Sequence, residues 1–200
     1  MKNTKLFMSA IAIASLFISS CTKDYMNISG IGPITTKTIQ VDNFSAIDME
    51  GVSDVYITYG TEQKVSVTGH ANIISRIQTD VSNGTWYIEL ERGNYGQYEL
   101  SYHLTLPLIE EIRSSGTGNV IINEFPAQED LSVKLIGTGS FKGFPMLVND
   151  CDIDISGSGN AEVSVESNLE VNIDGSGSVY YKGDPIIRDH IQGSGTVSKL

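Results

Sequence analysis

The sequence predicts an all-β fold, a right-handed parallel β-helix or β-solenoid with short coils of about 18–21 residues. One signature, Gly-Thr-Gly or Gly-Ser-Gly, occurs five times in the second half of the chain, and its first glycines are separated by 21, 20, 18 and 18 residues. These first glycines are Gly116, Gly137, Gly157, Gly175 and Gly193. A near-constant period of this size is typical of proteins in which each repeat forms one coil. Alternating apolar and polar residues are more frequent than helix-period patterns, which also favours strands.

Aligning the repeats on the first glycine separates apolar columns from polar ones. The column four positions after that glycine is apolar and contains Val120, Phe141, Ala161, Val179 and Val197. The column three positions after it is polar and contains Asn119, Ser140, Asn160, Ser178 and Thr196. One repeat cannot bury its apolar side chains alone, whereas coils stacked at about 4.8 Å bury a continuous column. The glycines then mark a corner where the chain adopts a positive φ or where successive coils approach closely.

We therefore predict a solenoid over residues 112–200, right-handed by the rule for parallel crossovers. The stretch from Gly51 to Tyr59 looks like a degenerate repeat, with Gly51 aligned to Gly116 and Val55 to Val120. Asn83-Gly84 predicts a hairpin, residues 71–81 allow one helical turn, and residues 98–106 alternate like a half-buried strand. We expect these earlier strands to continue the solenoid or to cover its N-terminal end.

The N-terminus has the features of a secretory signal. Lys2 and Lys5 precede an apolar run over residues 6–18, which is too short to span a bilayer. Ile18-Ser19-Ser20-Cys21 resembles the bacterial lipobox, in which the peptide is cut before a cysteine that carries lipid. We predict a lipoprotein signal peptide at 1–20, a lipidated tether at 21–35 with Cys21 as the lipid site, and a single domain at 36–200. The alternative is an ordinary signal peptide with a cysteine there by chance.

Charge and cysteine content exclude several classes of protein. The net charge is −11, and removal of residues 1–20 takes away two lysines and no acid, which leaves −13. Such a chain repels nucleic acid and anionic lipid surfaces, so we expect membrane attachment through lipid and no nucleic-acid partner. Cys151 has no intramolecular partner once Cys21 is lipidated, and its alternation with Ile153 and Ile155 predicts a buried small hydrophobe.

Four features together resemble a known family. They are the lipobox, the strand pair Phe44–Ile47 and Gly51–Val55, the Leu106-Pro107-Leu108 step and the repeated glycine corners. The combination resembles the bacterial adhesin family described as a putative autotransporter adhesin head domain, common among gut Bacteroidetes, over about residues 37–197. The resemblance implies a β-helical, non-enzymatic protein of the cell envelope, anchored by lipid to the outer membrane on its surface or periplasmic side. It brings no set of ligand-binding residues with it.

Candidate chemistry lies on the outer columns of the coils. Asp150, Asp152 and Asp154 alternate on one strand, and on a carbohydrate-cleaving β-helix such acids would be catalytic or would bind calcium. Here one column contains both signs of charge, in the order Glu111, Ser132, Asp152, Glu170 and Arg188. That mixture is typical of a solvated face, so we expect no catalytic, metal or cofactor site. A β-helical polysaccharide-active enzyme or a carbohydrate-binding protein is the alternative function.

Partners are predicted from aromatic residues and from the last coil. Tyr95, Tyr98 and Tyr102 cluster around a Gly-containing loop and, with Trp86, provide stacking surfaces for a glycan, although Tyr98 and Tyr102 are equally compatible with a core position. A surface glycan or a protein is therefore the expected ligand. The last corner lies five residues before Leu200, and open backbone groups on that coil favour a homo-oligomer.

Overall fold

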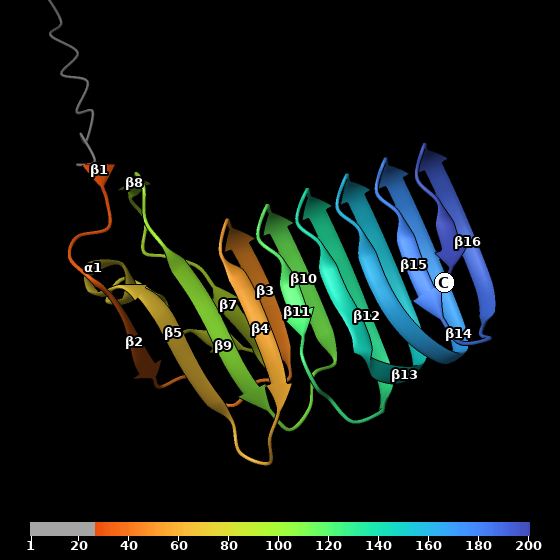
Figure 1. Ribbon diagram of the computed structural model, residues 1–200, viewed down its shortest axis with the longest axis horizontal. Coiled ribbons are helices and arrows are strands. Elements are labelled where there is room, and N and C mark those ends of the chain that lie inside the picture. Colours follow the sequence, from red (N-terminus) through yellow and green to blue (C-terminus); the bar gives the residue numbers. More distant parts are fainter. Residues whose placement is uncertain (1–26) are drawn as a thin grey trace, which may run out of the picture.

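The computed structural model describes residues 27–200, which form an all-β protein with one helical turn (Figure 1). The all-β prediction is confirmed. The predicted signal peptide, residues 1–20, and the lipid site Cys21 lie outside the described residues. The described part of the expected tether contains β1 (Asn27–Ile28) and the start of β2 (Ile34–Ile39), so it is attached to the domain. Within residues 27–200, no helix has the length and apolar character needed to cross a membrane.

Two ladders of parallel strands run side by side through most of the molecule (Figure 1). The first ladder stacks β3 (Ala46–Gly51), β10 (Glu111–Gly116), β12 (Gln128–Gly137), β13 (Phe141–Gly157), β14 (Ala161–Gly175) and β16 (Ile186–Gly193). The second stacks β4 (Asp54–Tyr59), β11 (Val120–Ile122), β13, β14, β15 (Val179–Lys182) and β17 (Val197–Lys199). The register places all the first glycines opposite one another, and it places Gly51 opposite Gly116. The degenerate repeat at Gly51 is therefore confirmed.

The N-terminal strands both continue the ladders and cover their end. β7 (Thr85–Ile88) lies parallel to β3, and β9 (Leu100–Leu106) lies parallel to β4. β5 (Lys64–His70) then pairs antiparallel with β9, and β2 pairs antiparallel with β5. The parallel arrangement thus extends beyond residues 112–200 as far as β7 and β9 and stops there, because the tight turn after β4 reverses the chain direction before β5.

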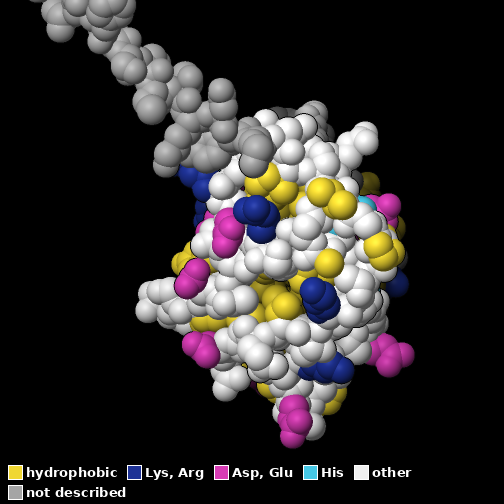
Figure 2. Space-filling model, turned by 90° about the vertical axis from the view of Figure 1, so that its left-hand side faces the viewer, with side chains coloured by type: hydrophobic (Ala, Val, Ile, Leu, Met, Phe, Trp, Pro, Cys, Tyr) yellow, Lys and Arg dark blue, Asp and Glu magenta, His cyan; other side chains and the backbone are white. Residues whose placement is uncertain are grey.

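Smaller elements of this end match the sequence. The predicted hairpin joins β6 (Val81–Ser82) to β7, with Asn83 at φ 52° and Gly84 at φ 78°. The predicted helical turn is α1 (Ala71–Ile74), and β1 pairs with β8 (Asn94–Tyr95). Figure 2 views this end of the molecule and shows hydrophobic side chains interspersed with Lys, Arg, Asp and Glu. The edge strand β2 carries an exposed Lys37 between threonines, which discourages pairing with a further strand.

The corners combine both geometries that the glycines were expected to allow. The first glycines have φ between 114° and 140°. A Cβ on a second glycine would lie 2.0–2.1 Å from a carbonyl oxygen of the preceding coil. The carbonyl oxygen of Gly137, for example, accepts hydrogen bonds from the N–H groups of Ser158 at 2.8 Å and Gly159 at 3.2 Å. At each corner the backbones of successive coils are therefore in direct contact and hydrogen-bonded.

Apolar columns fill the interior between the ladders. Val120, Phe141, Ala161 and Val179 are fully buried, and Cys151 is buried as predicted. The polar column beside them links the coils, since the Asn119 N–H and Nδ2–H both donate to Asp54 Oδ1, at 2.8 and 2.9 Å. The column continues with N–H groups that donate to the preceding side chain, at Ser140, Asn160 and Ser178. This column is thus a ladder that begins at Asp54.

Candidate ligand-binding hollow

One corner of the stack contains an insertion. In the coil formed by β3 and β4, four residues separate Met49 from Asp54. The neighbouring pair of strands, β7 and β9, aligns Ile88 with Met49 and Ser101 with Asp54. Twelve residues separate Ile88 from Ser101. We call this segment, residues 89–100, the corner insertion. It replaces a tight corner by a loop that contains β8 and leaves room for a hollow.

The hollow has a volume of about 460 Å³ and lies between the corner insertion and the Gly51 corner. We call it the tyrosine hollow. Its walls come from the insertion itself, from the end of β3, from the segment after α1 and from the start of β9. The lining residues are Glu50, Ser53, Gln78, Glu89, Leu90, Glu91, Arg92, Gly93, Tyr95, Tyr98, Leu100 and Tyr102.

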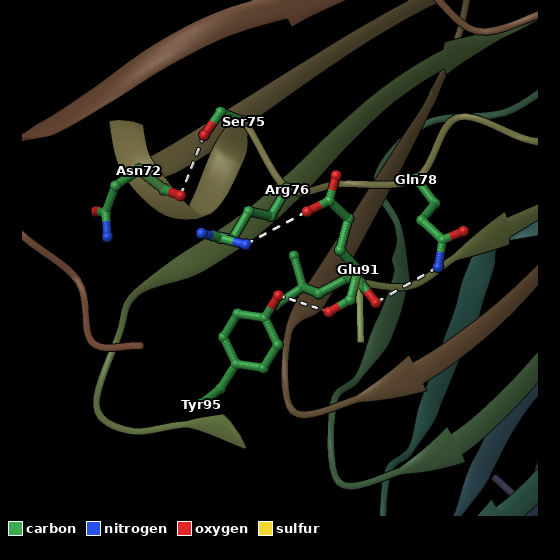
Figure 3. A network of polar contacts seen from close by, with 7 residues as sticks. Asn72, Ser75, Arg76, Gln78, Glu91 and Tyr95 are labelled. Atoms are coloured by element: carbon green, nitrogen blue, oxygen red, sulfur yellow. Dashed lines mark hydrogen bonds and ion pairs between the residues drawn. The ribbon is translucent and has the colours of Figure 1, made fainter. Parts of the chain in front are cut away.

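A polar network holds the corner insertion in place (Figure 3). Arg76 Nη1 lies 3.3 Å from Glu91 Oε2, and the Tyr95 hydroxyl donates a hydrogen bond to the Glu91 carbonyl oxygen at 2.6 Å. Gln78 Nε2 donates to Glu89 Oε1 at 3.0 Å, while the Gln78 carbonyl oxygen accepts from Trp86 Nε1 at 3.1 Å. Because Trp86 is fully buried, the network connects the rim of the hollow to the core.

The three tyrosines cluster as the sequence predicted, but they have different environments. Tyr102 belongs to the core and contacts Trp86 edge-to-face, with ring centroids 5.9 Å apart. Tyr95 and Tyr98 are half-buried and contact each other edge-to-face at 5.9 Å. Burial, and next the charge of neighbouring Tyr95, raises the pKa of Tyr98, so its phenol stays protonated at neutral pH. The half-buried pair therefore offers ring surface to a ligand, and Tyr98 also offers a hydroxyl donor.

The electrostatic character of the hollow is acidic. Glu50, Glu89 and Glu91 all line it, and Arg92 is the one positively charged lining residue. Arg76 pairs with Glu91 from outside the lining. A carboxylate ligand would meet this excess of negative charge, whereas a neutral ligand with many hydroxyl groups would find carboxylate and amide partners.

The acidic outer columns have the register that the sequence predicted. Asp152 lies between Ser132 and Glu170 on neighbouring strands, and Arg188 follows Glu170. Burial, then the charges of Asp154 and Glu170, raises the pKa of Asp152. A shallow hollow of about 270 Å³ follows these acids across the coils.

The side chains around these columns behave as a solvated face. Asn168 Nδ2 donates to Asp150 Oδ1 at 2.6 Å, and Arg113 pairs with Asp48 of the neighbouring coil at 3.3 Å. Residues 27–200 contain no group of three or more His, Cys, Asp or Glu side chains suited to a metal ion. The histidines lie on three different strands, at His70, His103 and His190. The predicted lipid site, Cys21, lies outside the described residues.

Sequence reasoning found the tyrosines but missed the corner insertion. β7 has no glycine signature at its end, so the alignment of Ile88 with Met49 had no marker in the sequence. The signal that was available is the apolar alternation of Trp86 and Ile88, which matches Ile47 and Met49.

Comparison with known families places the fold. The sequence model of the family described as "Putative auto-transporter adhesin, head GIN domain" matches residues 43–143 and 127–185. The chain belongs to this family. The match includes the corner insertion and all but the last of the glycine corners, so the tyrosine hollow lies within the adhesin-head domain. No curated protein matches the chain.

Several solved structures are similar to this chain. A putative adhesin from Bacteroides fragilis is 20% identical, with a TM-score of 0.58, over 87% of this chain and 100% of that one. A putative adhesin from Parabacteroides merdae is 19% identical, with a TM-score of 0.47, over 87% and 99%. A protein from Parabacteroides distasonis described as a putative lipid binding protein is 19% identical, with a TM-score of 0.48, over 87% and 99%. The first of these shows the shared fold.

Proposed function

We propose that this protein is a non-enzymatic adhesin of the bacterial cell envelope that binds its ligand in the tyrosine hollow. In this proposal Cys21 carries lipid in the outer membrane, and the coils form a right-handed β-solenoid that acts as a rigid scaffold. Membership of the adhesin-head family supports a binding role at the cell surface. The observation that carries the proposal is the corner insertion, because it departs from the tight-corner pattern and half-buries two tyrosines beside a hollow.

The alternative function is a polysaccharide-active enzyme that uses the acidic columns. Asp152 lies flat on a strand between a serine and a glutamate, and no inserted loop between the neighbouring coils encloses it. Glycoside hydrolysis needs two carboxylates held on opposite sides of a sugar bond in a cleft that the loops define. A screen of polysaccharides with purified protein decides this, since cleavage that Asp152→Ala abolishes would contradict the binding role.

Binding by the tyrosine hollow is tested on a glycan array with the mature protein carrying Cys21→Ser. Tyr98→Ala removes one of the two half-buried rings, and we expect it to reduce binding by about tenfold or more, since aromatic contacts contribute about 0.5–1.5 kcal/mol beyond their buried area. Tyr180→Ala is the matched control, because Tyr180 is half-buried on β15, far along the stack. Equal binding by wild type and Tyr98→Ala would contradict the proposed site.

Lipid attachment is tested separately by labelling cells with radioactive palmitate. We expect label and membrane association in the wild type and their loss in Cys21→Ser. Cys151→Ser is the control, because its buried thiol has a pKa raised to about 12 by burial and, secondarily, by Asp152. A wild-type protein that carries no label and fractionates with soluble proteins would establish an ordinary signal peptide. Protease treatment of intact cells then distinguishes the surface from the periplasmic side.

A further inference from the structure

The glycine corners share a hydrogen-bonding arrangement in which backbone N–H groups bind a carbonyl oxygen. After the first glycines Gly116, Gly137, Gly157 and Gly175, the next two N–H groups donate to a carbonyl oxygen of the preceding coil, and after Gly193 the Ser194 N–H does so. At the second corner the donors are the N–H groups of Thr117 and Gly118, which lie 2.9 and 3.3 Å from the carbonyl oxygen of Gly51. The following corners repeat the pattern with distances of 2.8–3.2 Å. Such paired N–H groups are a common way for backbone to bind an oxygen with partial negative charge.

The Gly51 corner has the same donors without a backbone acceptor. Val52 and Ser53 occupy the positions of Thr117 and Gly118, because the register aligns Gly51 with Gly116. The corner insertion carries the preceding coil elsewhere, and no backbone acceptor for these two N–H groups is found within residues 27–200. A Cβ on Gly51 would meet nothing within 4 Å, whereas on Gly116 it would lie 2.1 Å from an oxygen.

The Gly51 corner lies at the border of the tyrosine hollow. Ser53 is buried, with 8% of its surface exposed, and it lines the hollow together with Tyr98 and Leu100. A second hollow of about 280 Å³ is lined by Val52 and Ser53 and also by Tyr98. Ser53, Tyr98 and Leu100 line both hollows, whereas Val52 lines the second hollow alone, so the two hollows adjoin at Ser53 and Tyr98.

We infer that the tyrosine hollow, together with the adjoining hollow beside Val52, binds a neutral glycan that carries an acetamido group, whose carbonyl oxygen accepts hydrogen bonds from the Val52 and Ser53 N–H groups. An amide carbonyl reproduces the acceptor that every later corner receives from the protein itself. A sugar carboxylate also offers an oxygen, but the surrounding glutamates repel it. The Tyr98 ring packs on the apolar face of the sugar or on the acetamido methyl group, and Gln78 and the glutamates bind sugar hydroxyls. The inference rests on the proposed binding function of this site.

The ligand class is tested by calorimetric titration of the mature Cys21→Ser protein with three trisaccharides. These are N,N′,N″-triacetylchitotriose, cellotriose, which has the same linkage without acetamido groups, and trigalacturonic acid, which carries carboxylates. We expect the acetylated sugar to bind at least about tenfold more tightly than cellotriose, because it alone offers an amide carbonyl to the Val52 and Ser53 N–H groups. Trigalacturonic acid should bind most weakly.

A variant of the corner itself supplies the second test. Gly51→Ala adds a methyl group in the space where the acceptor oxygen sits at later corners, so it should weaken triacetylchitotriose binding by about tenfold and leave cellotriose unchanged. Gly32→Ala is the matched control, because Gly32 also has a positive φ and open space around it. Circular dichroism confirms that both variants fold.

The outcomes separate this inference from the proposed function. Equal binding of triacetylchitotriose and cellotriose, both lost in Tyr98→Ala, would overturn the acetamido assignment and leave the sugar-binding hollow intact. Failure of triacetylchitotriose to bind at millimolar concentration would also overturn the assignment, while the array experiment with Tyr98→Ala decides the function independently. Tighter binding of trigalacturonic acid would show that the site selects carboxylates and would overturn the role given to the glutamates.

Discussion

Three alanine variants separate the two physical reasons for glycine at the corners. Gly51→Ala introduces a side chain at φ 114° into open space, so it tests backbone conformation alone. Gly118→Ala has no positive φ, but its Cβ would lie 2.0 Å from the Ser53 carbonyl oxygen, so it tests close approach alone. Gly116→Ala combines a φ of 136° with a carbonyl oxygen at 2.1 Å. We expect the loss of stability to be smallest for Gly51→Ala, larger for Gly118→Ala and largest for Gly116→Ala.

The magnitudes follow from the same geometry. Backbone strain of this kind costs about 1–3 kcal/mol, which a less flexible unfolded chain offsets by about 0.4–1 kcal/mol, so Gly51→Ala should lose about 1 kcal/mol. A clash with backbone requires two coils to separate, and overpacking costs about 1–3 kcal/mol. Movement of Ser53 also disturbs the bonds between Asp54 and Asn119, so we expect about 3 kcal/mol for Gly118→Ala. With both causes, Gly116→Ala should lose about 4 kcal/mol.

Urea unfolding measures these differences. The fluorescence of Trp86, the single tryptophan, reports the N-terminal end, and circular dichroism reports the ladders. For a chain of this length about 1 kcal/mol corresponds to 2–4 °C, so the melting temperature of Gly116→Ala should fall by about 8–16 °C. A Gly118→Ala variant as stable as Gly51→Ala would refute the argument from close approach. A Gly51→Ala variant as stable as the wild type would refute the argument from backbone conformation.

Three further predictions concern polar groups of the stack. Asp152→Asn should stabilise the protein by about 0.5 kcal/mol at pH 7, because the raised pKa of Asp152 means that its charged form is disfavoured in the fold. The gain in stability should vanish as the pH falls below 4. Thermal melts measure it, with the exposed Asp42→Asn as the control. Asp54→Ala should destabilise by about 2 kcal/mol in urea, since two donors of Asn119 lose their acceptor, and an unchanged midpoint would contradict the ladder. Ser114→Ala should stabilise by about 1 kcal/mol in the same assay, because the buried Ser114 hydroxyl has no hydrogen-bond partner within residues 27–200; a loss of stability would indicate a partner such as water.

Much of the stack could be predicted because a corner leaves a strong mark in sequence. Only glycine combines a φ near 130° with a neighbouring carbonyl where a Cβ would lie, so each corner needs glycine and the period becomes visible. The apolar columns follow, since alternation on a strand sends every second residue inward. Ser53 occupies the position of a second glycine at the edge of the regular stack, where no preceding carbonyl oxygen approaches closely. Gly51 could therefore be aligned with the later corners even without a second glycine.

The N-terminal end was harder to predict for a physical reason. Alternation identifies a strand but not the direction of its neighbour, so nothing in Lys64–His70 distinguishes antiparallel from parallel pairing. The corner insertion left no periodic mark, because its side chains are fixed by long-range contacts such as Arg76 with Glu91. The tyrosines could be named as candidates, but the position of the Gly51 corner beside them depends on strand register, which contacts between residues distant in sequence create.

The pairing of β1 with β8 has a consequence for where the ligand must be. Asn27 is bound beside Asn94, inside the corner insertion, and Cys21 precedes it by only six residues. An extended chain spans at most about 3.6 Å per residue, so an acylated Cys21 would keep β8 within about 22 Å of the bilayer. The tyrosine hollow, which the corner insertion lines, would then lie near the membrane. Figure 1 shows that the later strands extend away from β1 and β8. A glycan bound there would be one that is attached to the protein's own membrane or that penetrates to its surface.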